Sequence, residues 1–104
     1  MALLKVFWTE TAIKQRNQIF EYWNNRNQSN EYSKKLRMKI NNHIQTLKKY
    51  PETGKKTDYE SIRALVMGHF SLLYKFDTIQ IIIVAFWDNR QDPEKLLEIL
   101  RQCN

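Results

Sequence analysis

The first third of the chain changes from a strand pattern to a helix pattern at Thr9. Residues 2–8 are short, apolar and aromatic, which predicts a β-strand. Thr9 is a suitable helix N-cap, and apolar positions recur at helical spacing from there to Trp23. The polar run at residues 24–28 ends this pattern. The sequence therefore predicts a strand followed by a helix.

A second amphipathic helix follows at once, with Ser29 as its predicted N-cap. Its apolar stripe comprises Tyr32, Leu36, Ile40, His43, Ile44 and Leu47. His43 is therefore interpreted as a core histidine. The segment 50–54 ends the helix, because a residue before proline disfavours the α conformation and Gly54 permits a positive φ. Two such helices joined by a short link predict an antiparallel hairpin.

After a basic loop at residues 55–60, apolar residues recur at every second position instead of at helical spacing. Residues 61–66 alternate weakly and residues 69–76 alternate well, so both predict strands. After a turn at Asp77, residues 79–87 are nearly all β-branched or aromatic, which predicts a strand covered on both faces. The polar run at 88–93 precedes a short helix or tail at 94–100.

The order of these elements is β-α-α-β-β-β, which is typical of an α+β fold. We expect an antiparallel helical hairpin packed on a mostly antiparallel four-stranded sheet, in one domain spanning residues 1–104.

Composition agrees with this picture and excludes several others. Of the 104 residues, 42% are hydrophobic and 12% aromatic, which is enough for a packed core. Two glycines and two prolines are too few for the many tight turns of a sandwich or small barrel. The single cysteine, Cys103, excludes a disulfide within the chain. No apolar run approaches the roughly 20 residues that span a bilayer, so we expect a soluble cytoplasmic protein without a membrane partner.

The net charge of +6 is concentrated in one third of the chain. Residues 34–63 hold nine Lys and Arg against three Asp and Glu, and the remaining residues balance. Such a field favours a polyanion or an acidic protein as partner. The lysines expected to bind nucleic acid or a partner are Lys48, Lys49, Lys55, Lys56 and Lys75. The alternative is a solvated lysine face without a partner.

Familiar catalytic motifs are absent, since the sequence has no glycine-rich phosphate loop, paired metal-binding histidines or serine elbow. We therefore expect no cofactor and no metal. RNA cleavage without a metal needs only a base, an acid and cations for the phosphate. Arg63 and Arg90 could hold the phosphate, and His69 could serve as base or acid. Alternatively, His69 only ends a turn and the two arginines pair with acidic neighbours, Asp58, Asp88 or Asp92.

The chain resembles the RelE/ParE superfamily of bacterial type II toxin–antitoxin toxins over about residues 3–97. The resemblance rests on several segments in the family's order and spacing. The most specific has an arginine followed two residues later by Asp-Pro. The segments are Val6-Phe7-Trp8-Thr9 with Ala12, Pro51-Glu52-Thr53-Gly54, Ile62-Arg63-Ala64-Leu65, His69 to Phe76, and Phe86 to Pro93.

The resemblance implies a growth-inhibiting toxin of the plasmid-stabilisation type, neutralised by a cognate acidic antitoxin with which it could form a hetero-oligomer. RelE-like members cut mRNA on the ribosome, whereas ParE-like members poison DNA gyrase. Ser71 occupies the position at which the RelE-like nucleases carry an arginine, and their C-terminal tyrosine is replaced near Leu96 or Leu97. The resemblance therefore favours a ParE-like toxin. The alternatives are a metal-independent mRNA endoribonuclease using Arg63, His69 and Arg90, and a degenerate module that only binds.

Overall fold

The computed structural model describes residues 3–59, 61–91 and 93–102. Cys103 lies outside this part of the chain. The elements in order are β1 (Lys5–Trp8), α1 (Glu10–Asn27), α2 (Glu31–Lys49), the 3-10 turn η1 (Pro51–Thr53), β2 (Lys55–Lys56), β3 (Arg63–Met67), β4 (Phe70–Phe76), β5 (Gln80–Asp88) and α3 (Pro93–Gln102).

The strands form one mixed sheet in the order β1-β5-β4-β3-β2. β1 is parallel to β5, and every other neighbouring pair is antiparallel. The expected α+β fold with its helical hairpin is confirmed. The expected number of four strands is wrong, because Lys55 and Lys56 of the expected basic loop form a fifth strand that pairs with β3 at Ala64 and Arg63. The segment expected to be a helix or a tail is a helix.

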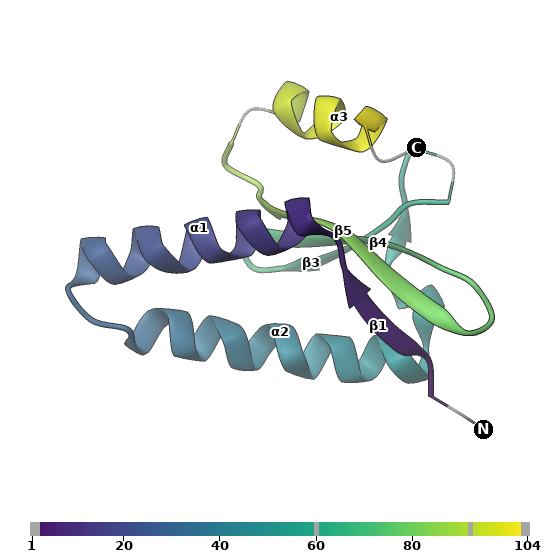
Figure 1. Cartoon of the computed structure of the whole chain (residues 1–104), viewed down its shortest axis with the longest axis horizontal. Helices are drawn as coiled ribbons and strands as arrows, with labels where there is room; N and C mark the ends of the chain where they lie inside the picture. Colours follow the sequence, from purple (N-terminus) through teal and green to yellow (C-terminus); the bar gives the residue numbers. More distant parts are fainter. Residues whose placement is uncertain (1–2, 60, 92, 103–104) are drawn as a thin grey trace.

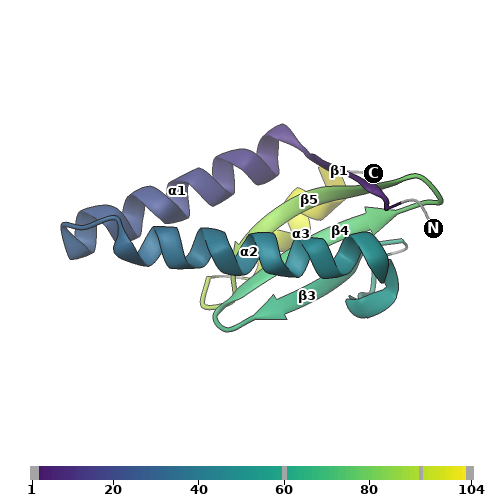
Figure 2. The same ribbon diagram turned by 90° about the horizontal axis from the view of Figure 1, so that it is seen from below.

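The two faces of the sheet carry separate cores. The α1–α2 hairpin packs on one face around Leu47, Leu72, Tyr74 and Phe86. A smaller cluster on the other face includes Leu73, Val84 and Trp87, with Leu96 of α3 packed against it. Figure 2 shows this layering, with α2 in front of the strands and α3 behind them.

A β-bulge in β5 fixes which residues reach each face. Leu73 is opposite Ala85, whereas the next residue, Tyr74, is opposite Ile83, so Val84 is the extra residue. Val84 and Ala85 consequently both belong to the cluster on the α3 face. Phe86 is returned to the hairpin face, where it stacks on Phe70 with 5.5 Å between ring centroids.

Thr9 joins the hairpin to this bulge. Its hydroxyl oxygen accepts a hydrogen bond from the Ala12 N–H at 3.2 Å, which confirms the predicted N-cap. The same hydroxyl donates to the Val84 carbonyl at 3.3 Å, and the Thr9 N–H donates to the Ile83 carbonyl at 3.0 Å. The start of α1 is therefore attached directly to β5.

Other local predictions need correction. The N-cap of α2 is Asn30 rather than Ser29, and the Ser29 hydroxyl instead accepts a hydrogen bond from the N–H of Glu31, the first residue of the helix. His43 is only partly buried, since it lies on the flank of the α2 stripe. Trp8 and Trp23 are also partly exposed, whereas Trp87 is buried.

Gly54 is required by close approach rather than by backbone conformation. Its φ is −69°, which any residue adopts, but a Cβ there would lie 2.6 Å from the Tyr74 hydroxyl. That hydroxyl accepts from the Gly54 N–H at 2.9 Å and donates to the Pro51 carbonyl at 2.6 Å. Arg63 donates from Nη1 to the Gly54 carbonyl at 2.8 Å. Tyr74 and Arg63 thus hold the segment that connects α2 to the sheet.

The fully buried hydroxyl of Tyr74 provides a test of this connection. Tyr74→Phe removes one donor and one acceptor while keeping the ring, and it leaves the Gly54 N–H and the Pro51 carbonyl without this partner. We expect the free energy of unfolding to fall by about 1–3 kcal/mol, measured by urea denaturation followed by far-ultraviolet circular dichroism. Tyr50→Phe is the matched control because the Tyr50 side chain is exposed. Equal stability of Tyr74→Phe and the wild-type protein would contradict this account.

Candidate functional site

The structure does not bring the three candidate catalytic residues together. Arg63 is the first residue of β3, and His69 lies in the turn beyond its last residue, Met67. Four residue steps along a strand cover about 13 Å, so Arg63 and His69 lie at opposite ends of β3. The side chain of Arg63 donates to the Gly54 and Glu52 carbonyls, which engages it with the backbone.

His69 and Arg90 do lie at the same end of the sheet. The Asn89 N–H, at the end of β5, donates to the His69 carbonyl at 2.7 Å. Ser71 on β4 donates to the Asn89 side-chain carbonyl at 2.7 Å. The loop after β5 is therefore fixed against the β3–β4 turn, next to the exposed His69 side chain.

Arg90 forms a bidentate ion pair with Asp88. Its Nη2 lies 2.8 Å from Oδ2 and its Nε lies 3.0 Å from Oδ1. These hydrogen bonds lower the pKa of the Asp88 carboxyl and raise the pKa of the Arg90 guanidinium. Both groups consequently stay charged near neutral pH, so the pair supplies fixed charge rather than a transferable proton. Of the acidic partners considered for Arg90, the structure shows Asp88, and Asp92 lies outside the described residues.

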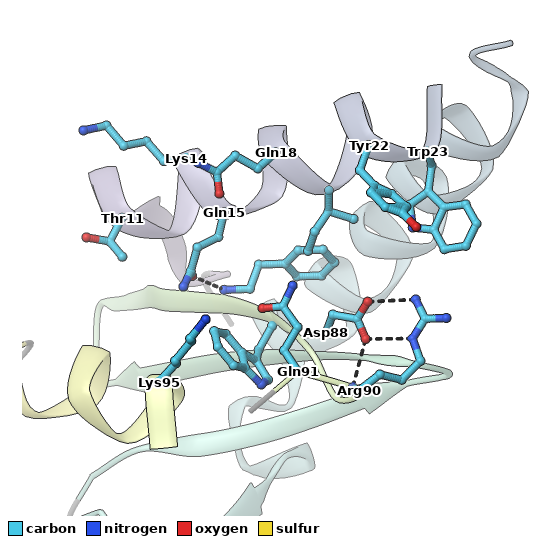
Figure 3. Close-up of a pocket in the computed structure, with 13 residues that line it drawn as sticks. Thr11, Lys14, Gln15, Gln18, Tyr22, Trp23, Asp88, Arg90, Gln91 and Lys95 are labelled. Carbon is cyan, nitrogen blue, oxygen red and sulfur yellow. Dashed lines mark hydrogen bonds and ion pairs between the residues drawn. The ribbon is translucent and has the colours of Figure 1, made fainter. Parts of the chain in front are cut away.

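A groove of about 740 Å³ opens between α1, the end of β5 and α3. Figure 3 shows Gln15 and Trp23 on the α1 side, Lys95 on the α3 side, and the Asp88–Arg90 pair between them. The Gln15 side-chain oxygen accepts from the Phe86 N–H at 2.9 Å, which attaches α1 to β5 along the groove.

The sequence did not reveal this groove. Trp23 ends the helical apolar pattern that the sequence shows, yet its ring is partly exposed and has two guanidinium groups over it. Arg26 lies 5.2 Å and Arg90 lies 5.5 Å from its centroid. The only signal in the sequence was the presence of Trp23 and Arg26 one helical turn apart.

The opposite end of the sheet is basic. Lys48 and Lys49 end α2, Lys55 and Lys56 form β2, and Lys75 lies near the end of β4. We call these five residues the basic end. None of them forms an ion pair with a carboxylate in the part of the chain that the structure describes. The predicted binding lysines therefore share one end of the molecule, although they are spread over both faces of the sheet.

The described residues contain no group of three or more His, Cys, Asp or Glu side chains placed to hold a metal ion. Within residues 3–59, 61–91 and 93–102, no helix is both long enough and apolar enough to cross a bilayer.

A first strand followed by a helical hairpin and an antiparallel meander agrees with the fold expected of a RelE/ParE superfamily toxin. The family model described as "ParE toxin of type II toxin-antitoxin system, parDE" matches residues 6–93. The chain therefore belongs to the ParE toxin family, and it is a toxin of the type II toxin–antitoxin class.

A solved structure has the same fold. The protein described as "Chromosomal ParDE TA system from P. aeruginosa" superposes with a TM-score of 0.70 at 17% sequence identity, over 83% of this chain and 96% of that chain. No curated protein sequence matches the chain.

The Asp88–Arg90 pair predicts a specific pH dependence of stability. Because folding lowers the Asp88 pKa, the pair stabilises the protein above the ordinary pKa of Asp, about 4, and this stabilisation is lost as pH falls through the lower folded value. Asp88→Asn should therefore be less stable than wild type at pH 7, with a difference that shrinks toward pH 3. Urea denaturation across this range measures it, with the exposed Asp58→Asn as control. A difference that does not change with pH would contradict the role given to Asp88.

Proposed function

We propose that this toxin arrests growth by binding and inhibiting an essential target, with DNA gyrase as the candidate, rather than by cutting mRNA. The observation that supports this proposal is that two of the three candidate catalytic residues are already engaged by other groups of the chain. Arg63 supports the Pro51–Gly54 segment through backbone carbonyls, and Arg90 is held by Asp88. Cleavage of RNA needs a base, an acid and phosphate-binding cations around one phosphate, and this arrangement does not gather them.

Ser71 further supports this proposal. It stands at the position where the RelE-like nucleases carry an arginine, and its side chain is buried and donates to Asn89. The hydroxyl thus holds the loop after β5 instead of presenting a charge to RNA.

We further propose that an acidic antitoxin binds and neutralises the toxin, forming a hetero-oligomer. The basic end supplies an electrostatic complement for such a partner, since its lysines lack described acidic partners. Gyrase and the ribosome are both cytoplasmic, so either target would require the protein to act in the cytoplasm.

One observation favours the alternative function, a ribosome-dependent mRNA endoribonuclease. His69 and Arg90 lie at the same end of the sheet, and the His69 side chain is exposed. A substrate bound there would meet one titratable group and one cation. This alternative is therefore the one against which gyrase inhibition is tested.

Inducing the chain without an antitoxin should arrest growth, and the purified protein should inhibit gyrase supercoiling and trap cleaved DNA. His69→Ala should arrest growth as wild type does, because the proposed mechanism involves no proton transfer at that residue. Primer extension on cellular mRNA after induction should show no new ends.

Two other outcomes would support the endoribonuclease or the binding-only module instead. New mRNA ends that disappear in His69→Ala would replace gyrase inhibition with the endoribonuclease. Normal growth on induction of soluble, folded protein would leave only a module that binds.

The positive charge of the basic end should also influence how strongly the toxin inhibits gyrase. The double variant Lys55→Gln/Lys56→Gln removes two charges from an exposed edge strand, and it should raise the concentration needed for half-inhibition of gyrase about three- to tenfold by slowing association. Lys34→Gln/Lys35→Gln removes the same charge from the exposed side of α2 and is the matched control. Equal loss in both variants would show that only net charge matters.

A further inference from the structure

Two arginines from distant parts of the chain lie together at one end of the groove between α1, β5 and α3. Arg26 is in the last turn of α1, and Arg90 is in the loop after β5. Their guanidinium carbons are 5.2 and 5.5 Å from the centroid of the Trp23 ring, which lines the groove. We call Arg26, Arg90, Tyr22 and Trp23 the arginine end of the groove. Two cations held at one aromatic ring by different elements form a preorganised place for an anion.

Asp88 fixes the orientation of Arg90 without covering it. The carboxylate accepts from Nε and Nη2, so the described hydrogen bonds leave Nη1 available. Within this ion pair, 49% of the Arg90 side-chain surface stays exposed. A guanidinium presents its N–H donors as a rigid fork, so a carboxylate can hold one edge while the other edge binds a second anion.

Arg26 brings a second charge that the described residues do not neutralise. Its side chain is exposed, and its Nη1 donates to the Tyr22 hydroxyl at 3.3 Å. Neither ion pair in the described part of the chain includes Arg26. A phosphate group carries several acceptor oxygens and pairs with guanidinium groups through charge-assisted hydrogen bonds. The arginine end therefore suits the phosphate group of a ligand.

The remainder of the groove can hold a planar polar group beside that phosphate. Its volume of about 740 Å³ lies within the roughly 300–1,000 Å³ typical of small-molecule sites. Figure 3 shows Gln18 and Tyr22 on the α1 side and Gln91 on the opposite side. Tyr22 is 52% exposed, so ring surface is available for stacking. Side-chain amides both donate and accept hydrogen bonds, which matches the polar edge of a nucleobase.

We propose that this groove binds a nucleotide. Arg26 and Arg90 hold its phosphate, the base stacks on Tyr22, and the amides of Gln18 and Gln91 bind the edge of the base. The inference goes beyond gyrase inhibition and does not depend on it.

A single nucleotide is favoured over a nucleic-acid strand because of where the charges lie. A strand needs cations along the whole groove to follow its phosphates, whereas Arg26 and Arg90 are both at one end. Further along α1, Lys14 is already paired with Glu10 at 3.3 Å. Of the residues that line the groove, Lys95 is the remaining cation.

The test uses the purified full chain and AMP that carries a fluorescent N-methylanthraniloyl group on its ribose. Fluorescence anisotropy should rise saturably with protein concentration, with a dissociation constant below about 1 mM. Unlabelled AMP should displace the probe. Adenosine and inorganic phosphate should each compete at least about tenfold less well than AMP, because each fills only one part of the site.

Charge variants test the arginine end. Arg26→Gln and Arg90→Gln should each weaken binding of the probe about tenfold, because each removes charge-assisted hydrogen bonds. Lys39→Gln removes the same charge from an exposed position on α2 that does not line the groove, and it should change binding less than about twofold.

Two variants of Tyr22 test the base separately from the phosphate. Tyr22→Leu removes the stacking surface and should weaken binding of the probe at least about fivefold. Tyr22→Phe keeps the ring and should bind the probe more tightly than Tyr22→Leu does. The position is exposed, so both variants should give the circular dichroism spectrum of the wild-type protein.

Three results would overturn the proposal: no binding of the probe, equal competition by inorganic phosphate and AMP, or equal weakening in Lys39→Gln and Arg26→Gln. A single-stranded oligonucleotide that competes better than AMP would replace the nucleotide with a nucleic acid. The assay contains no gyrase, so a negative supercoiling assay leaves nucleotide binding standing. Failure of the probe to bind, conversely, leaves gyrase inhibition standing.

Discussion

The extra residue in β5 is the constraint on which the rest of the molecule depends. Val84 is the extra residue between Ile83 and Ala85, the partners of Tyr74 and Leu73. As a result, Phe86 faces the helical hairpin and Trp87 faces α3. The Val84 carbonyl also accepts a hydrogen bond from the Thr9 hydroxyl, which caps α1. The bulge therefore sets the position of the hairpin and the direction in which β5 delivers the loop after Asp88.

The two ends of the sheet consequently have different chemistry. At one end, charges are already neutralised within the chain, since Arg90 is held by Asp88 and the loop is held by Ser71. At the other end, the lysines of the basic end lack described acidic partners. The fold thus keeps the lysines of the basic end away from its internally paired end.

Much of the fold could be predicted because long elements repeat a period many times. The α2 stripe and the apolar run of β5 are examples, and both were located within a residue or two. β2 could not be predicted, since two exposed lysines carry no hydrophobic pattern and pair only because β3 passes beside them. The site was harder to predict. A charge count located the basic third of the chain, but it could not show that Trp23 of α1 and Arg90 beyond β5 meet in one groove.

The parallel pairing of β1 with β5 also orders events during synthesis. β1 is synthesised first but can pair with β5 only after residues 80–83 have left the ribosome. The hydrogen bond from the Thr9 hydroxyl likewise cannot form before its acceptor, the Val84 carbonyl, is made 75 residues later. A nascent chain shorter than this has neither an anchored β1 nor an attached α1. The sheet therefore gains its first strand, and α1 its attachment, only when nearly the whole chain has been made.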